Sequence, residues 1–233
     1  MGRQESPQFL PVPPWTALLV VVVALFAFAM LADAVMEGET LAFDYAVLKA
    51  LGVPEDTAAA SSGPGWLAEA ARDFTALGST AVLIFVVAAG AGHLAMRRRT
   101  AEAFLLVGAV GGGTVLSSVL KLGFDRPRPD FGGSVIEVYT AGFPSGHAML
   151  SAVTYLTLGA LVMRGEARSW MKSYVLALAI LTTVLVGASR IYLGVHWPTD
   201  VLAGWSVGAA WAVLCWLFAS MVVRGPSQPP RND

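Results

Sequence analysis

Six apolar stretches, each long enough to cross a lipid bilayer, dominate this chain. A hydrocarbon core of about 30 Å takes roughly 20 helical residues, and stretches of this kind occupy 15–33, 79–96, 102–122, 145–163, 170–188 and 198–222. Backbone polar groups in lipid have to be satisfied within their own segment, which favours helices over open sheets. The sequence therefore predicts an all-α fold, a six-transmembrane-helix bundle.

The amino-acid composition supports a membrane location and excludes some partners. Of the 233 residues, 56% are hydrophobic and only 13% are charged, whereas charged residues make up about 25% of a typical soluble domain. The formal net charge of −1 gives no general attraction to nucleic acid, so the lipid bilayer is expected as a partner and nucleic acid is not. The single cysteine, Cys215, cannot form an intrachain disulfide and is interpreted as a packing residue.

The chain length suits one domain, which we expect to span 15–222. A short segment, 1–14, precedes it, and the polar, proline-rich tail 223–233 is predicted to be disordered. The segment 34–78 joins the first two apolar stretches and carries several acidic residues. Within it, residues 66–74 alternate between apolar and polar at roughly helical spacing, which predicts an interfacial helix in the first outer loop.

The positive residues divide unevenly between the two sides of such a bundle. Of the 15 Lys and Arg residues, nine fall in the termini and alternate loops: Arg3, Arg97, Arg98, Arg99, Arg164, Arg168, Lys172, Arg224 and Arg231. The other side holds six: Lys49, Arg72, Lys121, Arg126, Arg128 and Arg190. Because loops rich in Lys and Arg tend to remain in the cytoplasm, both termini are predicted to be cytoplasmic.

Three polar segments interrupt the apolar pattern at the ends of predicted spans: Lys121–Pro129, Pro144–His147 and Ser189–Asp200. Charged and proton-transferring groups are costly beside hydrocarbon, so their presence there indicates a functional site. With six spans, all three segments fall on the outer face, opposite the termini. The sequence therefore predicts that they form one site that faces outward.

The residue types in these segments suit the binding of a phosphate group. Lys121, Arg128 and Arg190 supply positive charge and several N–H donors, and the arginine fork matches two phosphate oxygens at once. Ser145 and Gly146 stand at a predicted helix start, where free backbone N–H groups and the helix dipole favour an anion. We therefore predict a phosphate-binding cluster.

Two histidines supply the reactive groups. His196 and Asp200 are four residues apart near a predicted helix start, so the carboxylate can orient the imidazole as a nucleophile or base. His147 is the candidate acid. The sequence shows no compact Asp/Glu/His cluster of the kind that a magnesium or zinc site needs, so no metal and no other cofactor is expected. Arg126 fits either a substrate contact or an ion pair with Asp125 or Asp130.

The three segments match the patterns K-x6-R-P, P-S-G-H and S-R-x5-H-x3-D at every fixed position. In this the chain resembles the type 2 phosphatidic acid phosphatase (PAP2) superfamily, specifically its bacterial six-span lipid phosphatases. The resemblance implies a nucleophile at His196 oriented by Asp200, a general acid at His147, a phosphohistidine intermediate and no metal. It also implies the following phosphate ligands: Lys121, Arg128, Ser145, Gly146 and Arg190.

Substrate and location follow from the same resemblance as expectations. We expect a multi-pass protein of the bacterial inner membrane that hydrolyses a lipid phosphate or pyrophosphate, with undecaprenyl pyrophosphate favoured because its recycling takes place outside. Phosphatidylglycerophosphate, phosphatidate and diacylglycerol pyrophosphate are the alternative substrates. A lipid phosphotransferase and a non-catalytic phospholipid-binding protein are the alternative functions. The sequence leaves the oligomeric state open.

Overall fold

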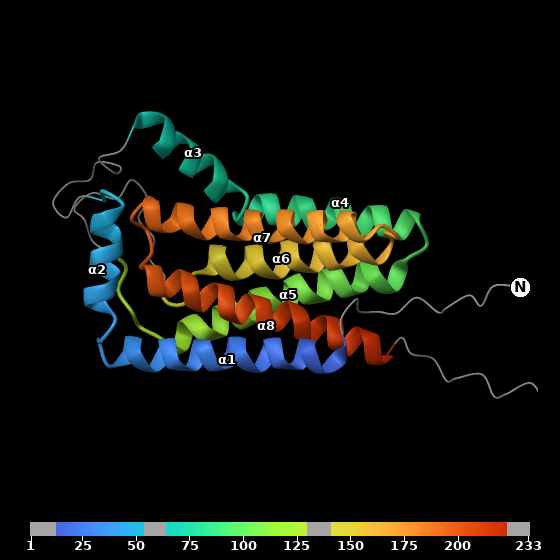
Figure 1. Ribbon diagram of the computed structural model, residues 1–233, viewed down its shortest axis with the longest axis horizontal. Coiled ribbons are helices and arrows are strands. Elements are labelled where there is room, and N and C mark those ends of the chain that lie inside the picture. The colour runs from blue at the N-terminus through green and yellow to red at the C-terminus, as the bar shows by residue number, and fades with distance from the viewer. Residues whose placement is uncertain (1–12, 54–63, 130–140, 223–233) are drawn as a thin grey trace, which may run out of the picture.

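The computed structural model describes residues 13–53, 64–129 and 141–222, and within these ranges it contains only helices and no strand (Figure 1). The helices are α1 (Pro14–Met36), α2 (Leu41–Ala50), α3 (Gly65–Ala76), α4 (Thr80–Met96), α5 (Thr100–Gly123), α6 (Gly146–Arg164), α7 (Ser169–Tyr192) and α8 (Pro198–Val222). The predicted all-α fold is confirmed for this part of the chain. The predicted terminal segment and tail lie almost entirely outside the described residues.

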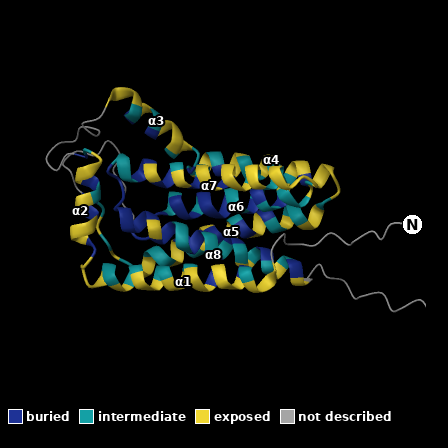
Figure 2. Cartoon of the chain, in the orientation of Figure 1, coloured by how far each residue is buried: buried dark blue, intermediate teal, exposed yellow. Residues whose placement is uncertain are grey.

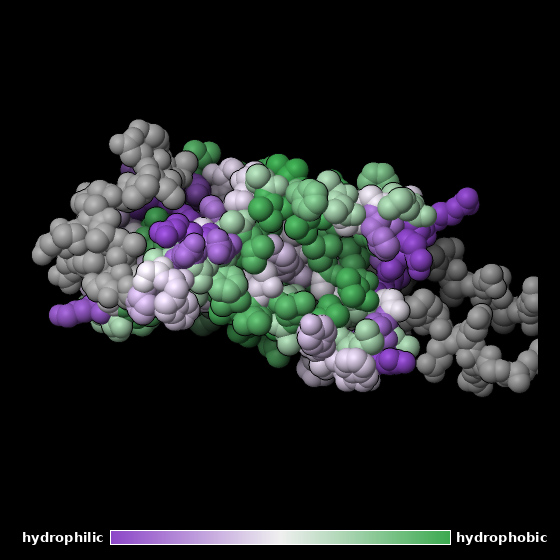
Figure 3. Space-filling view, turned by 90° about the horizontal axis from the view of Figure 1, so that it is seen from above, coloured by the Kyte–Doolittle hydropathy of each residue, from purple (hydrophilic) through white to green (hydrophobic). Residues whose placement is uncertain are grey.

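Five of these helices are each long and apolar enough to cross a membrane, namely α1, α5, α6, α7 and α8. Helices α3 and α4 are bent by 50° at a short break and make a sixth span if they are taken together. In the face drawn in Figure 3, apolar side chains form a band across the middle and polar ones gather toward both ends. The prediction of a multi-span membrane bundle is therefore confirmed.

Helix α6 lies at the centre of the bundle and packs along α7 and α8, while α1 packs on the far side of α8. Figure 2 shows the consequence: α6 is mostly buried, whereas α1 and α4 expose much of their surface. The side chains that α1 exposes are apolar ones such as Leu18, Val22 and Phe26. Exposed apolar surface on an outer helix is what contact with lipid requires, because lipid tails are as apolar as the side chains.

Two glycines of α8 bring its backbone against that of α6. A Cβ atom added at Gly204 would lie 2.6 Å from the carbonyl oxygen of Ser145, and one added at Gly208 would lie 2.5 Å from that of Met149. Small residues four apart allow membrane helices to approach this closely. The contact fixes the start of α6 against the start of α8, where the backbone N–H of Ser145 donates to the carbonyl of Asp200 across 2.9 Å.

Helices α2 and α3 lie at one end of the bundle, and the described chain begins and ends at the other (Figure 1). Helix α3 covers residues 66–74, for which the sequence predicts a helix. Helix α2 was not predicted. It crosses the end of the bundle and contacts α8, which brings the first inter-span segment next to the predicted site.

Candidate active site

All three polar segments of the sequence meet at the α2 end of the bundle. Helices α5 and α7 end there, and α6 and α8 begin there. The alternating direction of consecutive helices produces this arrangement, since each segment lies next to a helix end on the same side. The structure therefore brings together the residues that the sequence assigns to one site.

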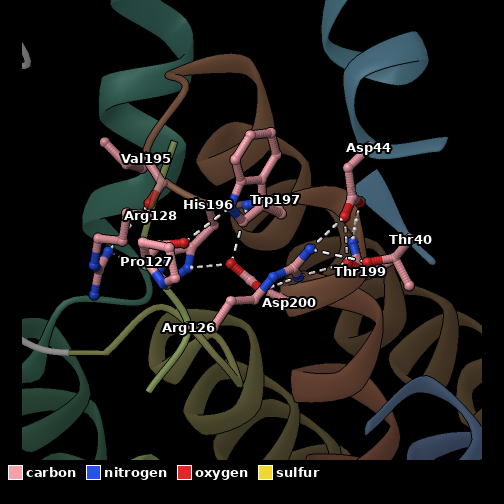
Figure 4. Close-up of polar contacts among 10 residues, drawn as sticks. All are labelled: Thr40, Asp44, Arg126, Pro127, Arg128, Val195, His196, Trp197, Thr199 and Asp200. Atoms are coloured by element: carbon pink, nitrogen blue, oxygen red, sulfur yellow. Dashed lines mark hydrogen bonds and ion pairs between the residues drawn. The ribbon is translucent and has the colours of Figure 1, made fainter. Parts of the chain in front are cut away.

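A buried histidine and aspartate lie at the centre of this site (Figure 4). His196 Nδ1 is 3.3 Å from Asp200 Oδ2, and both side chains are buried. The same Asp200 oxygen accepts the backbone N–H of Trp197 across 3.0 Å. On the opposite edge of the ring, Arg128 Nη1 is 3.0 Å from His196 Nε2. The imidazole is therefore held on both of its nitrogens.

The surroundings of His196 keep it neutral. Burial lowers the pKa of His196 well below its ordinary value, and the charges of Arg128, Arg190 and Lys121 lower it further; a hydrogen bond to the Gly142 backbone opposes them. A neutral imidazole has one nitrogen with a free lone pair. His196 can therefore act as a nucleophile or a base at neutral pH.

Two buried polar atoms at this site lack a hydrogen-bond partner within the described residues: Ser145 Oγ and Arg190 Nε. Ser145 is the N-cap residue of α6, yet its hydroxyl makes no capping bond. Arg190 is anchored by another atom, since its Nη1 donates to Thr75 Oγ1 across 3.1 Å. Buried polar groups are almost always hydrogen-bonded, and both of these atoms could donate to the oxygens of a bound phosphate.

Lys121 lies beside the same helix start. A Cβ atom added at Gly146 would lie 3.5 Å from Lys121 Nζ and 3.5 Å from Ser117 Oγ. The absence of a side chain at Gly146 thus leaves the first N–H groups of α6 next to an ammonium group. This combination favours an anion, because the helix dipole and the cation act in the same direction.

His147 lies in the first turn of α6, under the bend between α3 and α4. A Cβ atom added at Gly78 would lie 3.3 Å from His147 Cδ2, and Tyr155 holds the bend by donating from its hydroxyl to the carbonyl of Leu77 across 2.7 Å. His147 interacts electrostatically with Arg190 and His196, among other groups. The second histidine therefore faces the same cations as the first.

Arg126 has two carboxylate partners, and neither is a neighbour in sequence. Its Nη1 donates to Asp200 Oδ1 across 2.6 Å, and its Nη2 donates to Asp44 Oδ2 across 2.7 Å. Both partners are fully buried. Of the two predicted ion-pair partners, Asp125 makes no ion pair with it and Asp130 lies outside the described residues. The guanidinium of Arg126 is thus committed to Asp44 and Asp200.

Sequence reasoning missed four residues that contact this site: Asp44, Thr75, Trp197 and Thr199. Asp44 had a detectable signal, since it is the one acidic residue of the mostly apolar helix Leu41–Ala50. Trp197 lies between the predicted nucleophile and its carboxylate in sequence, and its Nε1 donates to the carbonyl of Pro127 across 3.0 Å. Within the described ranges, no group of three or more His, Cys, Asp or Glu side chains is placed to hold a metal ion.

Fold and site together define a class, a multi-span helical membrane protein with a buried neutral histidine beneath a cluster of cations. The model of the PAP2 superfamily matches residues 102–224. Phosphatidylglycerophosphatase B of Bacillus subtilis is 40% identical over 145 residues, which cover 61% of this chain and 70% of the relative. The undecaprenyl-diphosphatase of Sulfolobus acidocaldarius is 42% identical over 67 residues, which cover 29% of this chain and 28% of that protein.

A solved structure gives the same result at the level of the fold. The crystal structure of a transmembrane PAP2 type phosphatidylglycerolphosphate phosphatase from Bacillus subtilis is similar with a TM-score of 0.78 at 30% identity, and the match covers 88% of this chain and 98% of that one. The chain belongs to the PAP2 superfamily. It is a membrane lipid phosphatase of that metal-independent family.

Proposed function

We propose that this protein hydrolyses the phosphate of a membrane lipid through a phosphohistidine formed on His196. The observation that carries the proposal is the pair of unsatisfied buried donors, Ser145 Oγ and Arg190 Nε, beside a buried neutral histidine. A phosphoryl group has oxygens for these donors and a phosphorus atom for the imidazole. Phosphoryl transfer depends mostly on positioning and charge stabilisation, which this cluster of cations provides.

Substrate binding completes the site. The phosphate oxygens accept hydrogen bonds from Ser145 Oγ, Arg190 Nε and the N–H groups at the start of α6. Lys121 neutralises part of the charge. In this structure Arg128 donates a hydrogen bond to His196 Nε2. When the substrate binds, the same N–H donates to a phosphate oxygen instead, and the lone pair of Nε2 then faces phosphorus.

The reaction then proceeds in two displacements. In the first, His196 Nε2 forms a bond to phosphorus, the bond to the leaving oxygen breaks, and a protonated His147 gives its proton to that oxygen. The negative charge of the bound phosphate favours the protonated form of His147. In the second, water attacks phosphorus, His147 takes its proton, and the bond to His196 breaks to release phosphate.

Phosphatidylglycerophosphate is the leading substrate candidate. A phosphatidylglycerophosphatase B is 40% identical over 61% of this chain, and the similar solved structure is a phosphatidylglycerolphosphate phosphatase. Undecaprenyl pyrophosphate, which the sequence favoured, is the second candidate, and the match to an undecaprenyl-diphosphatase supports it over 29% of the chain. A site between helix ends suits either lipid, because the headgroup reaches the cations while the tail stays in the bilayer.

The proposal includes an orientation in the membrane. Nine of the 15 Lys and Arg residues fall on the side of the termini, and basic loops tend to be cytoplasmic. We therefore place the α2 end, with the site, at the outer face of the bacterial inner membrane.

Phosphate release by the purified protein tests the function. Phosphatidylglycerophosphate, undecaprenyl pyrophosphate, phosphatidate and diacylglycerol pyrophosphate are supplied in detergent micelles with EDTA and without any acceptor alcohol. Release of inorganic phosphate from at least one of them is expected, fastest from phosphatidylglycerophosphate. Transfer only after an acceptor is added would identify a phosphotransferase, and binding without turnover of any lipid would identify a non-catalytic protein.

A further inference from the structure

The network around Arg126 extends from the nucleophile to a helix of the first inter-span segment (Figure 4). Asp44 of α2 is fully buried. Its Oδ1 accepts the backbone N–H of Thr199 across 2.9 Å, and its Oδ2 accepts the Thr199 hydroxyl across 2.7 Å. Oδ2 also accepts Arg126 Nη2, and Thr40 Oγ1 accepts the same nitrogen across 3.0 Å. Every polar atom of this carboxylate is therefore occupied.

Arg126 connects this carboxylate to the one that holds the nucleophile. One guanidinium nitrogen donates to Asp200 Oδ1 and the other to Asp44 Oδ2. The ring of Trp197 covers the guanidinium, with Arg126 Cζ 5.7 Å from the ring centroid. The other oxygen of Asp200, Oδ2, faces His196 Nδ1 and also accepts the backbone N–H of Trp197. Asp44, Arg126 and Asp200 thus form one continuous row of alternating charge that ends at the neutral imidazole of His196.

We propose that Asp44 is a positioning residue for the reaction, which holds Arg126 so that Asp200 keeps both its orientation and its charge toward His196. The inference rests on the proposed function, because it assigns His196 as the nucleophile. Asp44, Arg126 and Asp200 together carry one net negative charge. That charge stabilises the positive charge that develops on the imidazole as it attacks phosphorus. Without the charge of Asp44, the positive charge of Arg126 is balanced by Asp200 alone, and the net negative charge next to the imidazole is lost.

If Asp44 has this role, changing the charges of the row should shift the acid limb of the pH profile of kcat/KM in a predictable direction. The acid limb is the low-pH side of the profile, where His196 becomes protonated in the free enzyme. The titratable and charged groups that face His196 come from four helices and one connecting segment: Lys121, Arg128, His147, Arg190 and Asp200. None of these is altered in the variants below. A shift in the acid limb therefore reports the change of charge at Asp44 or Arg126.

The experiment compares Asp44→Asn with Arg126→Gln over a range of pH values. Asp44→Asn removes a negative charge, which disfavours the imidazolium, so the acid limb should move to lower pH. Arg126→Gln removes a positive charge, so the limb should move to higher pH. Each shift should be about half a pH unit or more, given the screening typical of protein sites. The double variant restores the net charge and should return the limb close to its wild-type position.

The kinetic constants give a second readout. Asp44→Asn should lower kcat about tenfold and leave KM within about twofold, because the row touches the nucleophile and not the phosphate. The matched control is Glu102→Gln, since Glu102 is also a carboxylate bridging two arginines, Arg99 and Arg164, but at the opposite end of the bundle. This control should keep the wild-type kcat and acid limb.

The outcomes separate the proposal from its alternatives. Shifts of the same sign in both single variants, or no shift with a normal kcat, would show that Asp44 only fastens α2 to α8. If a single variant does not fold, the double variant decides, because it removes a charge pair and leaves no isolated buried charge. It should keep the wild-type limb with a kcat about tenfold lower, and a wild-type kcat would overturn the proposal. A wild-type protein that releases no phosphate would instead refute the proposed function.

Discussion

Arg128 Nη1 lies 3.0 Å from His196 Nε2, and this contact determines the tautomer of the histidine. A guanidinium has donors and no acceptor. Nε2 must therefore carry the lone pair, and the ring proton sits on Nδ1, facing Asp200 Oδ2 at 3.3 Å. The nitrogen available to attack phosphorus is thus the one that faces the cations, and the carboxylate stands behind it. This is the arrangement that an oriented nucleophile requires.

The lowered pKa of His196 predicts how stability depends on pH. Between the folded-state pKa and the unfolded value of about 6.5, the unfolded chain binds more protons, so the free energy of unfolding decreases as the pH falls below about 6.5. The slope from this one group is at most about 1.4 kcal/mol per pH unit. Thermal unfolding in detergent should show a shallower slope for His196→Gln than for the wild type. Identical slopes would contradict the burial of a neutral imidazole at this position.

The two histidines should respond differently to the leaving group. General acid catalysis contributes about 100- to 10,000-fold for a poor leaving group and much less for one that departs unaided. His147→Ala should therefore keep proportionally more activity on p-nitrophenyl phosphate than on a lipid phosphate. His196→Ala should fail on both substrates and form no phosphoenzyme. Equal proportional losses for His147→Ala on the two substrates would remove its assignment as the acid.

Vanadate, a phosphate mimic, should inhibit the enzyme, and EDTA should not. Ser145 Oγ and Arg190 Nε are the unsatisfied donors that vanadate oxygens would occupy. Arg190→Lys keeps the charge but loses the planar fork, so it should weaken vanadate inhibition about tenfold or more. The vanadate inhibition constant is measured without chelator, because EDTA complexes vanadate, and the effect of EDTA on activity is measured separately. Activity that vanishes in EDTA and returns with a divalent ion would count against charge stabilisation by side chains alone.

Thiol labelling tests the orientation. In a Cys215→Ala background, a cysteine at the exposed Glu69 of α3 should react in intact cells with a membrane-impermeant reagent. A cysteine at the exposed Arg97, at the opposite end of α4, should react only after permeabilisation. Each variant serves as the control for the other. The reverse pattern would place the site at the cytoplasmic face and would exclude a substrate headgroup on the outer leaflet.

The close contact between α6 and α8 should tolerate no side chain. In Gly204→Ala the new methyl group would lie 2.6 Å from the Ser145 carbonyl oxygen, so a backbone has to move. Overpacking of this kind typically costs about 1–3 kcal/mol, and activity should fall because Ser145 and Asp200 shift relative to each other. Gly108→Ala is the control, since nothing lies within 4 Å of the added Cβ atom. Equal melting temperatures for the two variants would show that the contact is not tight.

Much of this architecture could be predicted from the sequence because it depends on local patterns. The length and apolarity of each stretch determine a membrane helix, and the alternation of six such helices places all three polar segments at one end. The start of α6 at Gly146 was readable from Pro144 and Ser145. The spacing of His196 and Asp200 placed a carboxylate one helical turn from the imidazole. These features need no knowledge of how the helices pack.

The tertiary structure decided the features that join distant parts of the chain. Arg126 finds its carboxylates 74 and 82 residues away, at Asp200 and Asp44, whereas sequence reasoning considered only neighbours. Arg190 is anchored by Thr75, 115 residues away. The physical reason is that a buried charge takes whichever opposite charge the packing of the helices brings to it. The sequence determined which polar groups lie at the end of each membrane helix, and the packing of the helices determined which of these groups contact one another.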